Sequence, residues 1–452
     1  MSFNSFEYLI FLPVVVIVYY AIPKTRWRNG WLLVASYFFY MNWNASYAIL
    51  LLAATTVTYV GALLMSRGRK KLWLIVCLTI NLGILFCFKY FMIWNVVLPV
   101  GISFYTLQSV GYLIDVYRGD IEAEKNPVVY ALFVSFFPQL VAGPIERSKN
   151  LLGQFKQEPK GPKYENFQKG ILWIMYGLML KLVIADGLAL IVDEIYDATE
   201  VYTGWYIVVA TILFSIQIYC DFYGYSTIAR GSASLLGIEL MSNFEAPFYS
   251  KSVQEFWRRW HISLSSWFKD YMYIPMGGNR QGKKRKCINL LIVFGVSGLW
   301  HGAAWSFVIW GLLNGAYQVV GNFKHKKEAR LFSEKLLMTI ATFILFAFSM
   351  LFFRAGSTPE SIETLSHMIQ GLGNWTIIFT IPSMLKAGVV PAILLLAVID
   401  YLKYRNVDVI GGIIRQQTWF RCLTYLILLV MILLFGCYGQ NYDAKQFIYF
   451  QF

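Results

Sequence analysis

Four histidines are the only imidazole groups in the chain, and they are the first candidates for acid–base chemistry: His261, His301, His325 and His367. His301 lies in the apolar, glycine-rich stretch 295–305. An ionisable group in such a setting is destabilising unless it faces the protein interior. Burial disfavours the imidazolium form, so the ring stays neutral and able to accept a proton, as a general base must. A catalytic base and a hydrogen-bonded core histidine remain equally good interpretations.

His261 lies in the stretch 256–267, where aromatic and basic residues alternate. This pattern is typical of an amphipathic interfacial helix anchored by Trp and Arg, which does not exclude a functional site on the same helix. His325 lies in a run of lysines and His367 in a partly polar stretch. We therefore interpret both as solvated surface residues.

Other nucleophile, nucleotide and metal signatures are absent from the sequence. There is no GxSxG, GxxxxGK[ST], HExxH or GxGxxG pattern, so hydrolase, NTPase and zinc-protease hypotheses have no support. The six cysteines are scattered without a CxxC pair, and we expect no metal site.

Three acidic residues lie in or beside apolar segments: Asp115, Asp186 and Asp221. Buried acids of this kind can form the proton or ion relay of a transporter. More often they make structural ion pairs, for which Lys181, Arg118 and Arg230 are the available partners. Both interpretations remain open at this stage.

The composition indicates a membrane protein. Of 452 residues, 58% are hydrophobic and 14% are charged, against about 25% charged in an average soluble domain. The net charge of +14 would favour nucleic-acid binding in a soluble protein. Here the basic residues form short runs between apolar stretches, as cytoplasmic loops do, for example at 67–71, 283–286 and 324–327. We therefore expect no nucleic-acid partner.

Apolar windows of about 20 residues recur along the whole chain. They predict an all-α polytopic membrane protein with roughly eleven transmembrane helices, further re-entrant and amphipathic helices, and a single domain over 1–452. If the basic run 24–28 is cytoplasmic, the N-terminus lies outside. A last helix over 419–437 then leaves an external tail, about 438–452. Residues 130–142 are predicted to dip into the membrane and return.

Residues 221–286 mix glycines, prolines, aromatics and charges. The stretch is too polar to cross a bilayer simply and too aromatic for an ordinary loop. Irregular backbone at membrane depth is tolerated only where it is buried in protein or lines a cavity. We therefore expect the functional site in this part of the chain.

The chain resembles the membrane-bound O-acyltransferase family over residues 138–315, and in particular the bacterial branch that includes the alginate O-acetyltransferase membrane subunit. Five ordered motifs carry the resemblance, and together they are specific: FPQLVAGPI at 137–145, IYCDF at 218–222, EFWRRWHISLS at 255–265, DYMYIPMGGNR at 270–280 and SGLWHG at 297–302. The resemblance implies a helical fold around a central tunnel. It also implies that His301 is the catalytic base and that His261 is a second functional histidine.

The same resemblance implies a cytoplasmic acyl donor, usually acetyl-coenzyme A, and no tightly bound cofactor. Six residues near the histidines are then expected to contact the donor: Arg258, Arg259, Trp260, Lys269, Asn279 and Arg280. His301 would deprotonate an acceptor hydroxyl as it attacks the thioester. Candidate donors to the resulting oxyanion are His261, Asn314 and backbone amides near Gly298 or Gly302.

The C-terminal sequence FIYFQF at 447–452 resembles the aromatic motif that ends the polysaccharide-acetylating members. The resemblance implies that Tyr449 accepts the acyl group and carries it outward. A frayed or simply packed tail is the alternative. The orientation predicted from the basic runs places this tail outside, where a polysaccharide lies.

The sequence thus predicts a plasma (inner) membrane enzyme that passes an acetyl group to an extracellular polysaccharide or cell-wall glycan. An extracellular serine-hydrolase-like (SGNH-type) acetyltransferase is expected as the partner that completes transfer. One alternative is D-alanyl, lipid or protein acylation by the same family, although the stretch 277–280 looks more like the acetylating branch. The other is a polysaccharide or lipid transporter, which would tend to show internal repeats that this sequence lacks.

Overall fold

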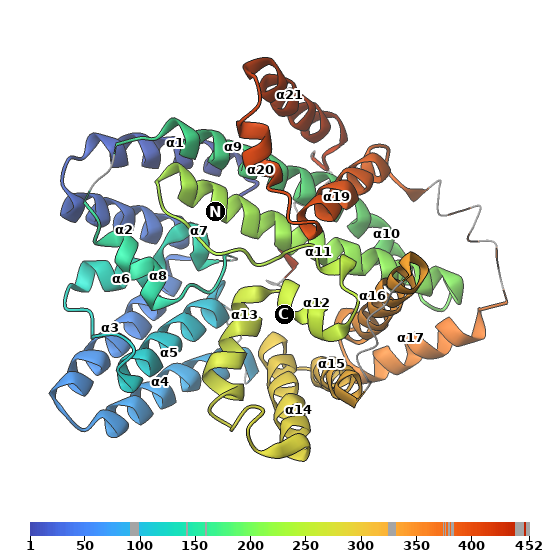
Figure 1. The fold of residues 1–452 in the computed structure, drawn as a ribbon, viewed down its shortest axis with the longest axis horizontal. Coiled ribbons are helices and arrows are strands. Elements are labelled where there is room, and N and C mark those ends of the chain that lie inside the picture. The colour runs from blue at the N-terminus through green and yellow to red at the C-terminus, as the bar shows by residue number, and fades with distance from the viewer. Residues whose placement is uncertain are drawn as a thin grey trace. The chain divides into compact units, whose positions relative to one another are not determined.

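The computed structural model describes residues 1–90, 99–141, 143–158, 161–323, 331–373, 375, 377, 380, 384–438 and 447–448. All regular secondary structure in these residues is helical (Figure 1). The all-α prediction is therefore confirmed. Tyr449 and His325 lie outside the described residues.

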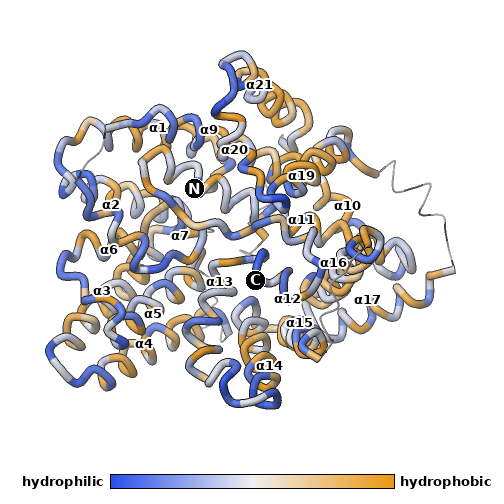
Figure 2. Tube along the Cα trace, in the orientation of Figure 1, coloured by the Kyte–Doolittle hydropathy of each residue, from blue (hydrophilic) through white to orange (hydrophobic). Residues whose placement is uncertain are grey.

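Six helical stretches in the described part of the chain are long and apolar enough to cross a membrane: Ala45–Arg67, Lys70–Tyr90, Tyr164–Tyr196, Trp205–Leu235, Phe332–Arg354 and Thr418–Phe435. Phe6–Ala21 is a shorter apolar helix. Figure 2 shows hydrophobic residues along α16, α19 and α21 and a hydrophilic end of α14. The chain is a multi-pass membrane protein, and the further spans in the expected total of eleven stay a prediction.

The chain folds as two compact units, each described here by itself. The first comprises Met1–Ile174 with Tyr225–Ser242. Its helices are α1 (Phe6–Ala21), α2 (Thr25–Met41), α3 (Ala45–Arg67), α4 (Lys70–Tyr90), α5 (Ile102–Arg118), α6 (Pro127–Ser135), α7 (Phe137–Leu140), α8 (Ser148–Phe155), most of α9 (Tyr164–Leu178) and the end of α11 (Trp205–Leu235).

Residues 130–142, predicted to dip into the membrane, contain two short buried helices of the first unit. Asn126 begins α6 by accepting backbone N–H bonds with its side chain, and Pro127 occupies the first turn, where no N–H is needed. The break between α6 and α7 falls at Phe136, whose backbone is not helical, and Pro138 lies in the first turn of α7, where no N–H is needed. Phe136 and Phe137 are fully buried. The structure thus divides this stretch at Phe136, and its dip into the membrane stays a prediction.

The second unit comprises Met175–Gly224 with Asn243–Phe452. Besides the end of α9 and most of α11, its elements are the π-helical segment Met179–Ala185, α10 (Asp186–Tyr196), the 3-10 turn Pro247–Tyr249, α12 (Val253–Arg259), α13 (Ile262–Phe268), the π-helical turn Lys269–Tyr273, α14 (Gly282–His301), α15 (Trp305–Phe323), α16 (Phe332–Arg354), α17 (Thr358–Gln370), α19 (Val389–Tyr404), α20 (Val409–Ile414) and α21 (Thr418–Phe435).

The irregular stretch expected from residue 221 begins later, after α11 ends at Leu235. Asp221, Ser226 and Thr227 are buried polar residues within that helix. Because a helix satisfies its own backbone hydrogen bonds, these side chains need polar partners but do not require the helix to end. The start of the irregular stretch was therefore predicted about fifteen residues too early.

Candidate active site

His301 is the last residue of α14 and is 5% exposed. Its ring meets three aromatic rings edge-on: Trp300 at 4.9 Å between centroids, Trp310 of α15 at 5.0 Å and Phe353 of α16 at 5.3 Å. Trp310 and Phe353 also contact each other at 5.1 Å. The imidazole therefore lies in an aromatic cage built by three helices, facing the protein interior as the sequence predicted.

Glycines allow α14 and α15 to pack closely beside this histidine. A Cβ added at Gly298 would collide with the backbone carbonyl oxygen of Phe307, and one at Gly311 would collide with that of Phe294. Small residues at a helix interface let the two backbones approach in this way. The space beside Gly298 is thus filled by α15, and the Gly302 N–H donates to the Gly298 carbonyl at 3.3 Å.

Gly298→Ala is expected to push α14 from α15, displace His301 and lower both stability, by about 1–3 kcal/mol, and transfer activity. Gly295→Ala, one turn earlier on α14, is the matched control, because its Cβ would meet Leu312 at an ordinary 3.4 Å. Thermal unfolding and acyl transfer of the two variants check this. Equal behaviour of Gly298→Ala and Gly295→Ala would show that the close approach has no functional consequence.

His261 is the residue immediately before α13, and its backbone has a left-handed conformation with φ of +42°. Such a conformation costs on the order of 1–3 kcal/mol in a non-glycine residue and persists only where the surroundings enforce it. Asn243 provides that enforcement, since its carbonyl accepts from the Ile262 N–H at 2.9 Å and its side chain from the Ser263 N–H at 3.3 Å. Held strain of this kind is a feature of functional sites. Nothing in the sequence pattern singles out Asn243.

The His261 side chain is 1% exposed, and its ring lies edge-on to Phe222 at 4.5 Å. It belongs to a junction of short helices outside the six candidate spans. Burial lowers the pKa of His261 to about 3, so its imidazole is neutral near pH 7. A neutral ring has one N–H donor and one acceptor nitrogen, which suits it to hydrogen bonding.

Trp300 connects the two histidines within the second unit. Its ring centroid lies 6.3 Å from that of His261 and 4.9 Å from that of His301. The structure therefore brings both predicted histidines to one buried, aromatic-lined site, although 40 residues separate them in the sequence. We call these three residues, with Phe222, the histidine site.

The six residues predicted to contact the donor divide into two groups. Arg259 pairs with Glu255 at 3.1 Å, donates to the Glu245 carbonyl at 3.1 Å and lies 4.8 Å over the Tyr404 ring. Trp260 is 3% exposed and stacks on Phe256. These two residues support the fold around the site, whereas the other four are exposed: Arg258, Lys269, Asn279 and Arg280.

The buried acids of the second unit form an ion cluster with Lys181. The Lys181 Nζ lies 2.9 Å from Asp186 Oδ1 and 2.7 Å from Asp221 Oδ1, and none of the three side chains is more than 4% exposed. Lys181 lies in the π-helical segment, where the Asp186 N–H bonds to the Lys181 carbonyl five residues earlier. The structural ion-pair interpretation is confirmed for both acids. In the first unit, Asp115 accepts a hydrogen bond from the Ser148 hydroxyl at 2.5 Å.

Two described residues of the C-terminal tail pack inside the second unit. Phe447 and Ile448 are buried, and the Phe447 ring lies 5.5 Å from that of Phe222. The Ile448 N–H donates to Asp221 Oδ2 at 2.7 Å. At this point the chain meets both the ion cluster and the histidine site.

The surroundings of His367 differ from those of the histidine site. His367, expected at the solvated surface, is half-buried on α17, with its Nδ1 3.3 Å from the Thr199 hydroxyl.

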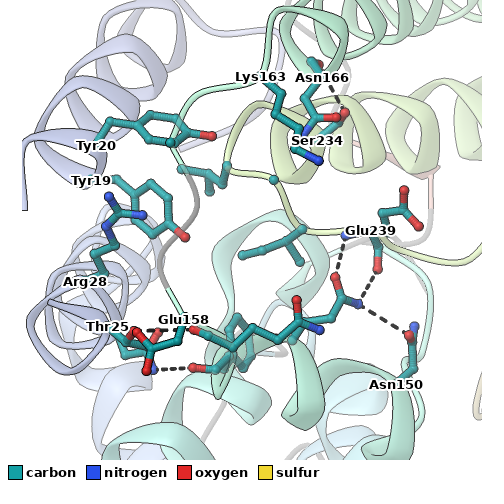
Figure 3. A pocket seen from close by; sticks show the side chains of 18 residues that line it. Tyr19, Tyr20, Thr25, Arg28, Asn150, Glu158, Lys163, Asn166, Ser234 and Glu239 are labelled. Atoms are coloured by element: carbon teal, nitrogen blue, oxygen red, sulfur yellow. Dashed lines mark hydrogen bonds between the residues drawn. The ribbon is translucent and has the colours of Figure 1, made fainter. Parts of the chain in front are cut away.

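A cavity of about 400 Å³ lies in the first unit, with Tyr19 and Tyr20 on one side and Lys163 and Glu239 among its other lining residues (Figure 3). Of the predicted site residues that the structure describes, none lines this cavity. The acid–base groups therefore place the candidate active site at the histidines and not there.

Comparison with known proteins indicates the type of reaction that the protein catalyses. The chain matches the membrane-bound O-acyltransferase family over residues 37–352. It is 35% identical to the probable alginate O-acetylase of Azotobacter vinelandii, covering 83% of this chain and 79% of that protein. It is also 35% identical to the peptidoglycan O-acetyltransferase of Helicobacter pylori, covering 79% of this chain and 78% of that protein. The teichoic acid D-alanyltransferase of Bacillus subtilis is 30% identical over 51% of this chain and 61% of its own.

The helical membrane fold and these similarities define a multi-pass membrane enzyme that transfers acyl groups. The chain belongs to the membrane-bound O-acyltransferase family. Its reaction is O-acylation, with an acyl donor as a substrate, and this excludes the transporter hypothesis.

Proposed function

We propose that the enzyme takes an acetyl group from cytoplasmic acetyl-coenzyme A and passes it across the plasma membrane for O-acetylation of a polysaccharide or cell-wall glycan. The observation that carries the proposal is the histidine site, where two buried imidazoles flank Trp300 beside the tail residues 447–448. The relatives named as O-acetylating cover 83% and 79% of the chain, against 51% for the D-alanyltransferase. We therefore favour acetyl over D-alanyl transfer.

In the proposed reaction His301 is the general base. It takes the proton from an acceptor hydroxyl as that oxygen attacks the thioester carbonyl, and the protonated ring then gives the proton to the leaving thiolate of coenzyme A. The new ester C–O bond replaces the C–S bond. His301 ends α14, and the negative end of a helix dipole stabilises a cation that forms there during the reaction.

The neutral His261 ring is a candidate donor to the oxyanion that forms on the thioester carbonyl. One such donor contributes about 3–4 kcal/mol to lowering a barrier of this type. The His261 ring is buried and packs edge-on against Phe222 at 4.5 Å, and such packing restricts its orientation, as preorganised stabilisation requires. Asn314 is a weaker candidate, because its side-chain amide donates to the Trp310 carbonyl at 2.9 Å.

Donor binding is assigned to exposed cations near the site. Arg258, Lys269 and Arg280 are solvent-facing and suit the phosphates of coenzyme A, while Asn279 adds a polar group in the same region. Arg259 and Trp260 support the helices on which these residues lie. This assignment assumes that the region faces the cytoplasm, as the basic run 283–286 predicts.

Tyr449 is proposed as the acceptor that carries the acetyl group outward to an extracellular SGNH-type partner. Both termini are then outside. Tyr449 directly follows Ile448, which is buried against Asp221. Radiolabelled acetyl-coenzyme A tests the relay, since wild-type protein should become labelled and Tyr449→Phe, which lacks only the hydroxyl, should fall to background.

Tyr442→Phe is the control in the same tail and should label like wild type. Coenzyme A release should be recorded in parallel, because hydrolysis to water can continue without the tyrosine. Persistent label on Tyr449→Phe would rule out this residue as the acceptor.

A further inference from the structure

We infer that the ion cluster of Lys181, Asp186 and Asp221 is the docking site for the chain's own C-terminal tail, and that Asp221 is a positioning residue for the transfer reaction. This inference rests on the proposed function in one respect, the use of Tyr449 as acyl acceptor. The docking itself is a structural claim that does not depend on that role. Nothing in the sequence motifs assigns a tail-binding function to these residues.

The charge of the cluster explains why it binds a backbone N–H. One ammonium group faces two carboxylates, and all three side chains are withdrawn from water. Buried carboxylates are stable only when their oxygens are hydrogen-bonded as well as paired. Asp221 gives Oδ1 to Lys181 at 2.7 Å and Oδ2 to the Ile448 N–H at 2.7 Å. The tail thus supplies a charge-assisted hydrogen bond to Asp221, which shares the Lys181 ammonium with Asp186.

A second contact fixes the start of the tail to the same π-helical segment. The Cys437 N–H, just after α21, donates to the Leu182 carbonyl at 3.0 Å. Leu182 is the neighbour of Lys181 in the chain. Backbone N–H groups at positions 437 and 448 are therefore both bonded to the ion cluster or its adjoining turn. π-helical segments inside α-helices often mark functional positions. Here the segment provides one anchor point through the Leu182 carbonyl, and α11 provides the other through Asp221.

Docking at the ion cluster brings the tail to the histidine site. The Phe447 ring contacts Phe222 at 5.5 Å, and Phe222 contacts His261 at 4.5 Å. Asp221 and Phe222 are consecutive residues of α11, so one turn of helix presents the anchor for Ile448 and the packing surface for Phe447. Asp221 touches the tail and no reacting atom. It acts by fixing the segment that immediately precedes Tyr449.

Hydrogen–deuterium exchange in the full-length purified protein tests the docking without reference to acetyl transfer. In Asp221→Leu the amides of the tail peptide should exchange roughly tenfold to a hundredfold faster than in wild type, as expected for loss of a hydrogen bond to a charged group. Asp221→Asn retains an acceptor oxygen and should keep most of the protection. Unchanged exchange in a folded Asp221→Leu protein would overturn the docking site.

The backbone donor can be removed without altering the ion cluster. Ile448→Pro deletes the N–H, whereas Ile448→Ala shortens the side chain and keeps the N–H, so it is the matched control. Labelling from acetyl-coenzyme A should fall at least about tenfold in Ile448→Pro relative to Ile448→Ala, as loss of a charge-assisted hydrogen bond predicts. Equal labelling of the two variants would overturn the positioning role of Asp221.

The two measurements separate this inference from the proposed function. If Tyr449→Phe keeps its label while Asp221→Leu frees the tail, the acceptor assignment fails and the docking site stands. If Tyr449→Phe loses its label while Asp221→Leu leaves exchange unchanged, the acceptor stands and the docking site is overturned.

Discussion

His301→Ala is expected to lower acetyl transfer by about two to four orders of magnitude, the usual contribution of a positioned general base. The His301 ring contacts Trp300, Trp310 and Phe353, whereas the His261 ring reaches this aromatic cage at Trp300, with 6.3 Å between the centroids. Water held in the vacated space is a much weaker base than imidazole. The measurement is the rate of coenzyme A release from acetyl-coenzyme A in purified, reconstituted protein.

His367→Ala provides the matched control, because it removes a half-buried histidine whose described contact is with Thr199. It should retain wild-type transfer. The elution profile and thermal unfolding of both variants must match wild type, so that lost activity reports chemistry and not folding. A folded His301→Ala protein with wild-type turnover would show that another group is the base, and His261 would then be the next candidate.

How well each part of the site can be predicted from the sequence depends on how far apart in the chain the interacting residues lie. His301 could be predicted as a candidate base because its evidence is local, an ionisable ring in an apolar, glycine-rich stretch within a specific motif. The all-helical membrane fold could be predicted for a similar reason, because the length and apolarity of each segment indicate whether it lies in the membrane or in water. Such properties depend on neighbours in the chain and not on the tertiary arrangement.

Interactions that depend on tertiary structure were not predictable in the same way. The sequence supplied three possible cations for the buried acids, and only the fold selects Lys181 for both Asp186 and Asp221. Arg259 has the same sequence context as Arg258, yet one is held by Glu255 and Tyr404 while the other is exposed. A residue type does not report which face of a short helix it occupies, and seven-residue helices are too short to show it by periodicity.

Glycines illustrate the same limit. The sequence shows that Gly298 has no side chain beside His301, and the structure shows that the backbone of α15 takes that space. The sequence does not indicate which element packs against this glycine. The strain at His261 was equally hidden, because the left-handed backbone is imposed by Asn243, eighteen residues earlier.

Lys181→Met is the second change with a large expected effect, here on stability. Removing the ammonium leaves Asp186 and Asp221 buried without their shared cation, and breaking a buried ion pair from one side costs about 3–5 kcal/mol. Methionine has a similar length and shape, so the loss reports charge more than volume. Denaturant unfolding in mixed micelles measures the free energy, and the exposed Lys269→Met should shift it by less than about 0.5 kcal/mol.

A charge-neutral variant of the same cluster separates lost charge pairing from lost packing. Combining Lys181→Met with Asp186→Asn and Asp221→Asn removes every formal charge while keeping side-chain volumes and an acceptor oxygen for the Ile448 N–H. Replacing a whole buried ion cluster by neutral groups is often close to neutral in stability, so this variant should recover most of the loss. If it is as unstable as Lys181→Met alone, the cluster stabilises the fold through specific hydrogen bonds of Lys181 and not through charge balance. Recovery of stability together with a docked tail would mean that the tail recognises the acceptor oxygen of residue 221, and that the ion pairs serve chiefly to hold that oxygen in place.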